Sequence, residues 1–183
     1  GTLFPYTTLF RSRLRCMYRR PNADGASGAE SRRRLSSRDR FLAILFSVAV
    51  AINFVWEMVQ MPLYENMPWA SLRSWLLCFR ASLGDGVIVV FIWLLGALLY
   101  RRRHWFRRLT PGTVGVLLIA GAAIAVGIEV HALAVGRWSY SQYMPLVPPL
   151  GVGLSPFVQL LLLPWICMKT AHSLLTEEPE RAG

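Results

Sequence analysis

The chain has 183 residues, of which 54% are hydrophobic and 16% charged, and its 20 basic and 10 acidic residues give a formal net charge of +10. This length suits a single domain. The excess of basic residues is typical of nucleic-acid-binding proteins, but here the charges occur in blocks between long uncharged runs, which such proteins do not need. The composition therefore favours an integral membrane protein, with no nucleic acid among its partners.

The two ends of the chain are expected to lie outside the folded domain. Residues 2–12 read TLFPYTTLFRS, which resembles a translated sequencing adapter, so we expect residues 1–16 to be an artefact and Met17 to be the start. Without them the formal charge falls to +7, from 17 basic minus 10 acidic residues. Residues 17–40 are rich in arginine, serine, glycine and alanine, which predicts a disordered cytoplasmic tail. Residues 174–183 are expected to form a second cytoplasmic tail.

Four apolar runs are long enough to cross a bilayer core, which requires about twenty helical residues. Their expected bounds are 41–61, 83–100, 113–135 and 155–173. They predict an all-α fold, a bundle of four transmembrane helices within residues 41–173. Between the first two runs, residues 71–82 carry apolar side chains at helical spacing. This pattern predicts either an interfacial helix or an upstream extension of the second span.

The basic residues predict the orientation of the bundle. Of the 20, 17 lie in the first tail, in the loop at residues 101–108 or near the C-terminus, and only Arg73, Arg80 and Arg137 lie in the other two loops. Because cytoplasmic loops are enriched in arginine and lysine, we expect both termini to be cytoplasmic. The protein is then a multi-pass protein of the plasma membrane.

Polar side chains recur near the outer end of every predicted span. Asn53, Glu57, Gln60 and Tyr64 follow one another at steps of four, three and four, which places them on one helix face. Three further polar residues have a similar depth: Asp85 at the outer start of the second span, Glu129 near the outer end of the third, and Gln159 early in the fourth. A carboxylate at membrane depth costs roughly 2.5 kcal/mol or more, so we expect these groups to face the bundle interior with partners.

Two interpretations of this polar layer remain open. In the structural one, Arg137 pairs with Glu57 and Glu129 in a clasp that orients the helices. In the functional one, burial keeps at least one carboxyl protonated, and it acts as an acid or base. The candidate catalytic residues are Glu57, Asp85 and Glu129. The candidate substrate-binding residues are Asn53, Gln60, Arg137, Tyr140, Tyr143 and Gln159.

No metal site and no cofactor are expected. Glu129 and His131 are two residues apart, so on a helix they point about 200° apart and do not chelate one ion together. The segment 144–156, MPLVPPLGVGLSP, is too rich in proline and glycine for a regular helix. It is expected to be either a loop that dips back over the polar layer or a surface connection.

Two resemblances rest on these motifs. GRWSYSQYMP and GVGLSPFVQ, together with NFVWEMVQMPLY and Gly84–Asp85, resemble an uncharacterised family of bacterial four-helix membrane proteins, over most of residues 41–171. This resemblance implies a bacterial inner membrane protein. Glu129, followed by Gly136-x-x-x-Tyr140 and a proline-rich turn, is similar to membrane carotenoid cyclases and hydratases, although their span count differs. That similarity implies carboxylic acids that protonate a polyene inside the bilayer.

These observations predict a membrane-embedded enzyme or binder that acts on a lipid or isoprenoid through buried carboxylates near the outer face. The alternative is a non-catalytic accessory or assembly subunit, in which the polar layer only sets the helix register. Membrane lipid is the expected environment under both hypotheses. A homo-oligomer and a partner subunit of a membrane complex both stay open.

Overall fold

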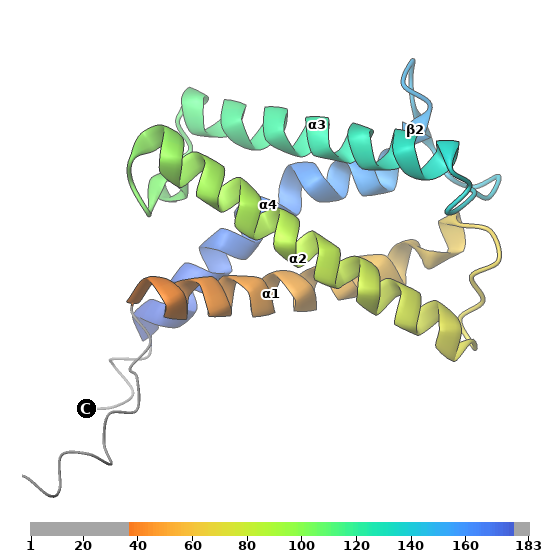
Figure 1. The fold of residues 1–183 in the computed structure, drawn as a ribbon, viewed down its shortest axis with the longest axis horizontal. Helices are drawn as coiled ribbons and strands as arrows, with labels where there is room; N and C mark the ends of the chain where they lie inside the picture. Colours follow the sequence, from red (N-terminus) through yellow and green to blue (C-terminus); the bar gives the residue numbers. More distant parts are fainter. Residues whose placement is uncertain (1–36, 178–183) are drawn as a thin grey trace, which may run out of the picture. The chain divides into compact units, whose positions relative to one another are not determined.

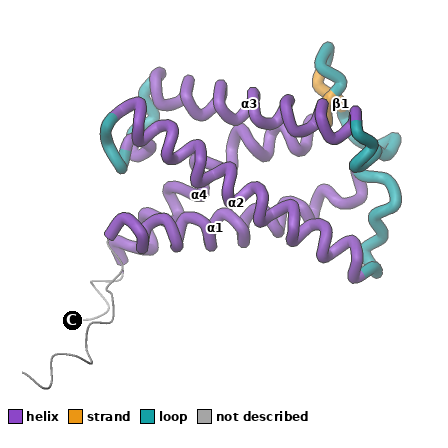
Figure 2. The backbone as a smooth tube through the Cα atoms, viewed as in Figure 1, coloured by secondary structure: helices purple, strands orange, loops and turns teal. Residues whose placement is uncertain are grey.

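The computed structural model describes residues 37–177, so the expected artefact and nearly all of the two expected tails lie outside the described residues. Four long helices account for most of this part of the chain: α1 (Ser37–Gln60), α2 (Leu72–Tyr100), α3 (Pro111–Ala134) and α4 (Leu154–Glu177) (Figure 1). Two 3-10 turns, η2 (Met61–Leu63) and η3 (Trp105–Arg107), follow α1 and α2. Figure 2 shows that the connecting loops gather at the two ends of the helices.

All four helices are long and apolar enough to cross a membrane, which confirms the predicted number of spans. The observed bounds of α1, α3 and α4 lie within a few residues of those expected. Helix α2 differs, because it begins at Leu72 and continues unbroken to Tyr100. The segment 71–82 is therefore an upstream extension of the second span, and a separate interfacial helix is not found. Arg73 and Arg80 had lowered the local hydropathy, but neither residue breaks a helix.

The helices pack as an antiparallel bundle in which α1 lies between α2 and α4, and α3 packs mainly on α4 (Figure 1). Large apolar side chains fill the core toward the end where α1 begins and α4 ends. Buried members include Phe41, Leu45, Trp93, Cys167 and Met168. The opposite half of the interior holds most of the buried polar side chains, so the two ends of the bundle differ in chemistry.

The loop from α2 to α3 is fixed by two tryptophans. The Trp105 indole donates to the Trp93 carbonyl oxygen at 3.1 Å, and the Trp93 indole donates to the Arg103 carbonyl oxygen at 3.1 Å. Gly96 makes this approach possible, because a Cβ there would lie 2.0 Å from the Trp105 ring. Thr110 then caps α3.

Helices α3 and α4 approach one another closely at Gly121. A Cβ at this position would lie 2.3 Å from the Leu160 carbonyl oxygen, so only glycine fits here. Beyond α3 the chain forms a short antiparallel hairpin from β1 (Leu146–Val147) and β2 (Val152–Gly153). The base of the hairpin is buried at Val152, and its tip exposes Leu150. This arrangement matches the expected surface connection more closely than a loop buried over the polar layer.

Candidate functional site

Helix α1 presents three polar side chains on its inner face near its C-terminal end. The Gln60 amide donates to Glu57 Oε1 at 2.9 Å, as expected for residues three apart on one face. The Asn53 amide donates to the Ala49 carbonyl oxygen at 2.8 Å, which leaves Asn53 Oδ1 free to accept from another helix. Asn53 is fully buried.

Gln159 of α4 joins this face to α2. Its amide nitrogen lies 2.9 Å from Asn53 Oδ1, 3.2 Å from Glu57 Oε1 and 3.0 Å from Asp85 Oδ2. Three acceptors from two other helices thus converge on a group with only two hydrogens. The side chain is 2% exposed, so no solvent donor replaces the missing one. The site is therefore short of hydrogen-bond donors.

Two further contacts complete what we call the polar cluster: Asn53, Glu57, Gln60, Asp85, Ser155 and Gln159. Gln60 donates to Gln159 Oε1 at 3.2 Å and accepts from the Ser155 hydroxyl at 2.7 Å. Ser155 was not among the candidate site residues predicted from the sequence. Ser155 lies four residues before Gln159 on α4, so the two share one helix face, and this spacing could have predicted the contact.

Glu57 and Asp85, the carboxyl pair, both accept from the Gln159 amide, at 3.2 and 3.0 Å, so their carboxyl groups lie close together. Two carboxyl groups so close repel each other when both are ionised, and a proton on one of them relieves that repulsion. Within residues 37–177 no basic side chain forms an ion pair with either member. The sequence placed Asp85 at the outer start of its span. Because α2 begins at Leu72, Asp85 instead lies 13 residues along the helix, in its middle.

Glu129 of α3 is held in a different way. Its Oε2 accepts from the Trp138 indole at 3.3 Å and from the Tyr140 hydroxyl. The same hydroxyl accepts from the backbone N–H of Gly153 at 2.8 Å, which connects the end of α3 to the hairpin. Glu129 is 4% exposed and lies close enough to Glu57 for the two to repel each other.

The expected ion pair between Arg137 and a glutamate is wrong: no such pair exists within residues 37–177, and the Arg137 side chain is exposed. Two neutral donors already satisfy Glu129, so a cation is not required, and the exposed guanidinium keeps its water. Tyr143, another expected site residue, is 72% exposed and does not join the polar cluster.

Tyr64 is a neighbour that the site prediction did not include. Its ring packs against those of Trp138 and Tyr140, with centroid separations of 6.2 and 5.8 Å. Two backbone hydrogen bonds hold the two loops together: Ser141 N–H donates to the Leu63 carbonyl oxygen at 2.9 Å, and Glu65 N–H donates to the Ser139 carbonyl oxygen at 3.0 Å. Burial raises the pKa of the Tyr64 and Tyr140 hydroxyls, and the nearby carboxyls add to both increases. Both phenols therefore stay neutral beside Glu129.

The arrangement offers hydrogen-bond and proton chemistry. The carboxyl pair offers two adjacent carboxyl groups, and amides from α1 and α4 fix their position. No group of three or more metal-binding side chains occurs within residues 37–177. No family model, curated protein or solved structure matches the chain.

Proposed function

We propose that this chain is a membrane-embedded protein that acts on a lipid or isoprenoid through the carboxyl pair, with Glu57 and Asp85 as the acid that donates the proton. One observation carries the proposal: two carboxyls share a buried amide and have no ionic partner among residues 37–177. An isolated carboxyl is costly in a bilayer, and a pair is more so, which makes an intramembrane acid a candidate functional group. A proton shared in this way suits transfer to an apolar substrate.

The polar cluster supports this assignment through the position of the pair. Gln60 and Gln159 donate only to Glu57 and Asp85 among the carboxyls, and they approach from two helices. These two amides fix the position of the acid, and no cation is needed to balance its charge. Glu129, although proposed from the sequence as a third acid, has both its donors within the adjoining loop, and its role is to hold that loop.

The second candidate is a non-catalytic accessory subunit, favoured by the way in which Gln159 connects three helices. In that case the polar cluster only sets the register of α1, α2 and α4. The two candidates make different predictions for isosteric variants. Loss of register lowers stability, whereas loss of an acid leaves a stable bundle without activity.

The test compares Glu57→Gln and Asp85→Asn with the wild-type chain in a host strain that lacks the gene. Deletion is expected to change the profile of extracted lipids and isoprenoids, and the wild-type gene should restore it. Both variants should accumulate in the membrane with a thermal midpoint close to that of the wild type, yet fail to restore the profile. Glu129→Gln is the matched control and should restore it.

Two outcomes would overturn the assignment. Restoration by both pair variants would show that neither carboxyl acts as an acid. A fall in stability that parallels the loss of activity would favour the accessory subunit. An enrichment of respiratory or secretion genes near this one would favour the subunit also, whereas isoprenoid genes would favour the enzyme.

The proposed orientation places both termini in the cytoplasm and the protein in a bacterial inner membrane. Its support is the asymmetry of basic residues: the α2–α3 loop holds Arg101, Arg102, Arg103, Arg107 and Arg108, whereas the other two loops hold few. A reporter fused after Arg108 should read cytoplasmic, and one near Tyr143 external. The reverse pattern would invalidate the orientation.

A further inference from the structure

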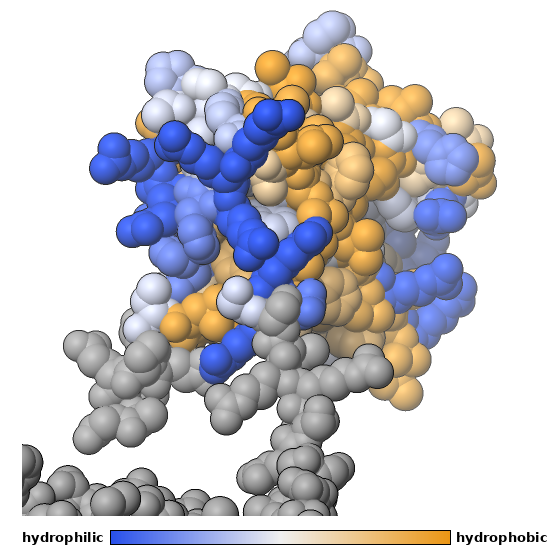
Figure 3. Space-filling model, turned by 60° about the vertical axis from the view of Figure 1, so that its left-hand side comes forward, coloured by the Kyte–Doolittle hydropathy of each residue, from blue (hydrophilic) through white to orange (hydrophobic). Residues whose placement is uncertain are grey.

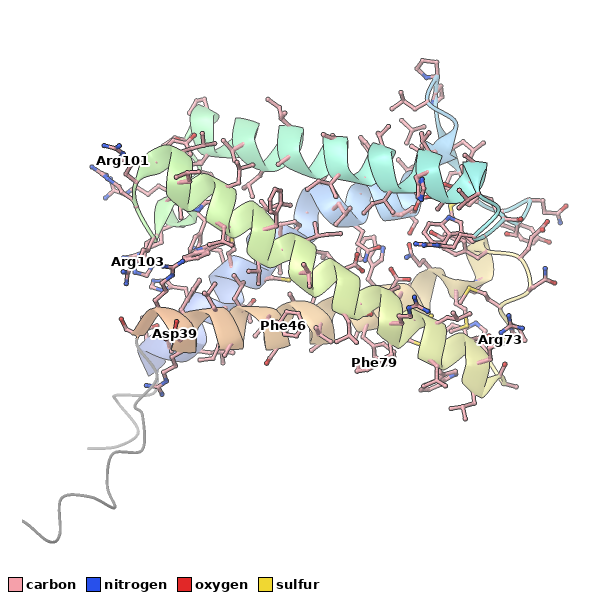
Figure 4. All side chains as sticks on the ribbon, viewed as in Figure 1. Asp39, Phe46, Arg73, Phe79, Arg101 and Arg103 are labelled. Atoms are coloured by element: carbon pink, nitrogen blue, oxygen red, sulfur yellow. The ribbon has the colours of Figure 1, made fainter. Side chains whose placement is uncertain are left out.

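The end of the bundle far from the polar cluster is strongly basic. Exposed cationic side chains surround it: Arg38, Arg101, Arg102, Arg103, Arg108 and Lys169. In Figure 4, Arg101 and Arg103 lie at this end of the bundle and point outward, whereas Arg73 lies at the opposite end. Figure 3 shows hydrophilic side chains gathered here beside a broad apolar side of the bundle. A charged rim thus adjoins a surface suited to acyl chains.

Four groups at this end converge on one place, and we call them the basic cluster: His104, Arg107, Lys169 and His172. The rings of His104 and His172 lie 5.0 Å apart, and both contact the ring of Phe106. Arg107 directly follows Phe106 in η3, which packs on α4, and Lys169 lies one helical turn before His172 on α4. Within residues 37–177 none of the four has a carboxylate partner. The guanidinium of Arg107 and the ammonium of Lys169 repel each other at this end unless an anion lies between them.

The basic cluster also has a rigid support. Phe106 is fully buried, and Trp105 is anchored to Trp93 through its indole N–H. The loop is therefore held against α2 and α4, and its cationic side chains have fixed starting points. A preorganised set of donors binds a phosphate more tightly than the same charges on a flexible tail.

We propose that the basic cluster binds the phosphate of an anionic phospholipid headgroup in the leaflet at this end. A lipid is favoured over a soluble phosphate because exposed apolar residues flank the cluster on two helices. Leu98 of α2 is 76% exposed, and Ile166 and Leu174 of α4 are 38% and 47% exposed. The acyl chains would lie along these side chains while Arg107 and Lys169 hold the phosphate. The proposal is independent of the carboxyl pair.

The test measures lipid selectivity by electron paramagnetic resonance of the purified chain in phosphatidylcholine bilayers. Spin-labelled phosphatidylglycerol should associate with the wild type more tightly than spin-labelled phosphatidylcholine. Because each basic residue near an anionic surface contributes roughly fivefold, the double variant Arg107→Gln/Lys169→Gln should reduce this preference by about 25-fold. The single variant Arg107→Gln should reduce it less.

The matched control is Arg73→Gln/Arg137→Gln, which removes the same charge from the opposite end and should keep the preference. Three results would overturn the proposal. The preference could survive the double variant, it could fall equally in the control, or millimolar inorganic phosphate could abolish it. The last result would show that the site takes a soluble anion.

Discussion

Glu129 and the carboxyl pair lie at the same end of the bundle, yet their hydrogen-bond donors differ in kind and number. Glu129 accepts from two aromatic donors that follow it closely in sequence. Glu57 and Asp85 depend on amides of α1 and α4, and the α4 amide also serves Asn53. Buried carboxyls in one half of a bundle can therefore differ in what holds them. Glu129 is tied to the adjoining loop, whereas the carboxyl pair is tied to a neighbouring helix.

The largest effect is expected from Gln159→Leu, which removes the common donor of the polar cluster. Asn53, Glu57 and Asp85 would lose this donor at once, and only Glu57 keeps a second one, so we expect the free energy of unfolding to fall by about 3 kcal/mol. Chemical denaturation in bicelles would measure it. Gln142→Leu, at an exposed loop position, is the control and should change little. A loss below about 1 kcal/mol would mean that Gln159 does not hold the pair.

A smaller effect is expected from Gly121→Ala, which tests whether the packing of α3 on α4 affects the protonation of the carboxyl pair. The new Cβ would meet the Leu160 carbonyl oxygen, and overpacking of this kind costs about 2 kcal/mol. The carboxyl pair lies on α1 and α2, so its proton should remain while the bundle is weakened. Gly115→Ala is the control, since nothing lies within 4 Å of a Cβ there. Loss of the shared proton in Gly121→Ala would show that the α3–α4 contact and the carboxyl pair are coupled.

The sequence predicted the helices well because hydropathy and length determine them. It left the start of α2 open between two alternatives, because Arg73 and Arg80 interrupt the apolar run without interrupting the helix. Helical spacing correctly placed Asn53, Glu57 and Gln60 on one face. It did not give the position of Asp85, because the depth of a residue depends on where its helix begins.

The partner of Glu129 was mispredicted for a different reason. Charge complementarity pointed to Arg137, but Trp138 and Tyr140 lie in the same loop and supply neutral donors. Which of several polar neighbours reaches a carboxylate depends on the path of the loop, and residue spacing does not specify that path. The contact between Tyr64 and Tyr140 could not be predicted for the same reason, since it joins two loops that are distant in sequence.

The smallest effect is expected from Tyr140→Phe, and it depends on pH. At neutral pH the variant should lose about 1 kcal/mol, because Glu129 loses one donor. Burial raises the pKa of the Tyr140 hydroxyl, so the folded state favours the neutral phenol. That contribution is fully present below the ordinary tyrosine pKa of about 10 and is lost as the pH rises through the folded-state value.

The stability difference between wild type and Tyr140→Phe should therefore narrow above about pH 10. Thermal midpoints measured from neutral to alkaline pH would show it. Tyr143→Phe is the matched control, because its side chain is 72% exposed, and it should follow the wild type throughout. A difference independent of pH would show that the Tyr140 proton does not contribute to the contact with Glu129.

The most direct test of the account is the infrared spectrum of the carboxyl pair at neutral pH. We expect the wild-type chain to show the carbonyl stretch of a protonated carboxylic acid. Glu57→Gln and Asp85→Asn should each abolish that band, because the new amide donates to the remaining carboxylate. Glu129→Gln should keep it. Absence of the band from the wild type, or its loss only in Glu129→Gln, would contradict the claim that Glu57 and Asp85 share a proton.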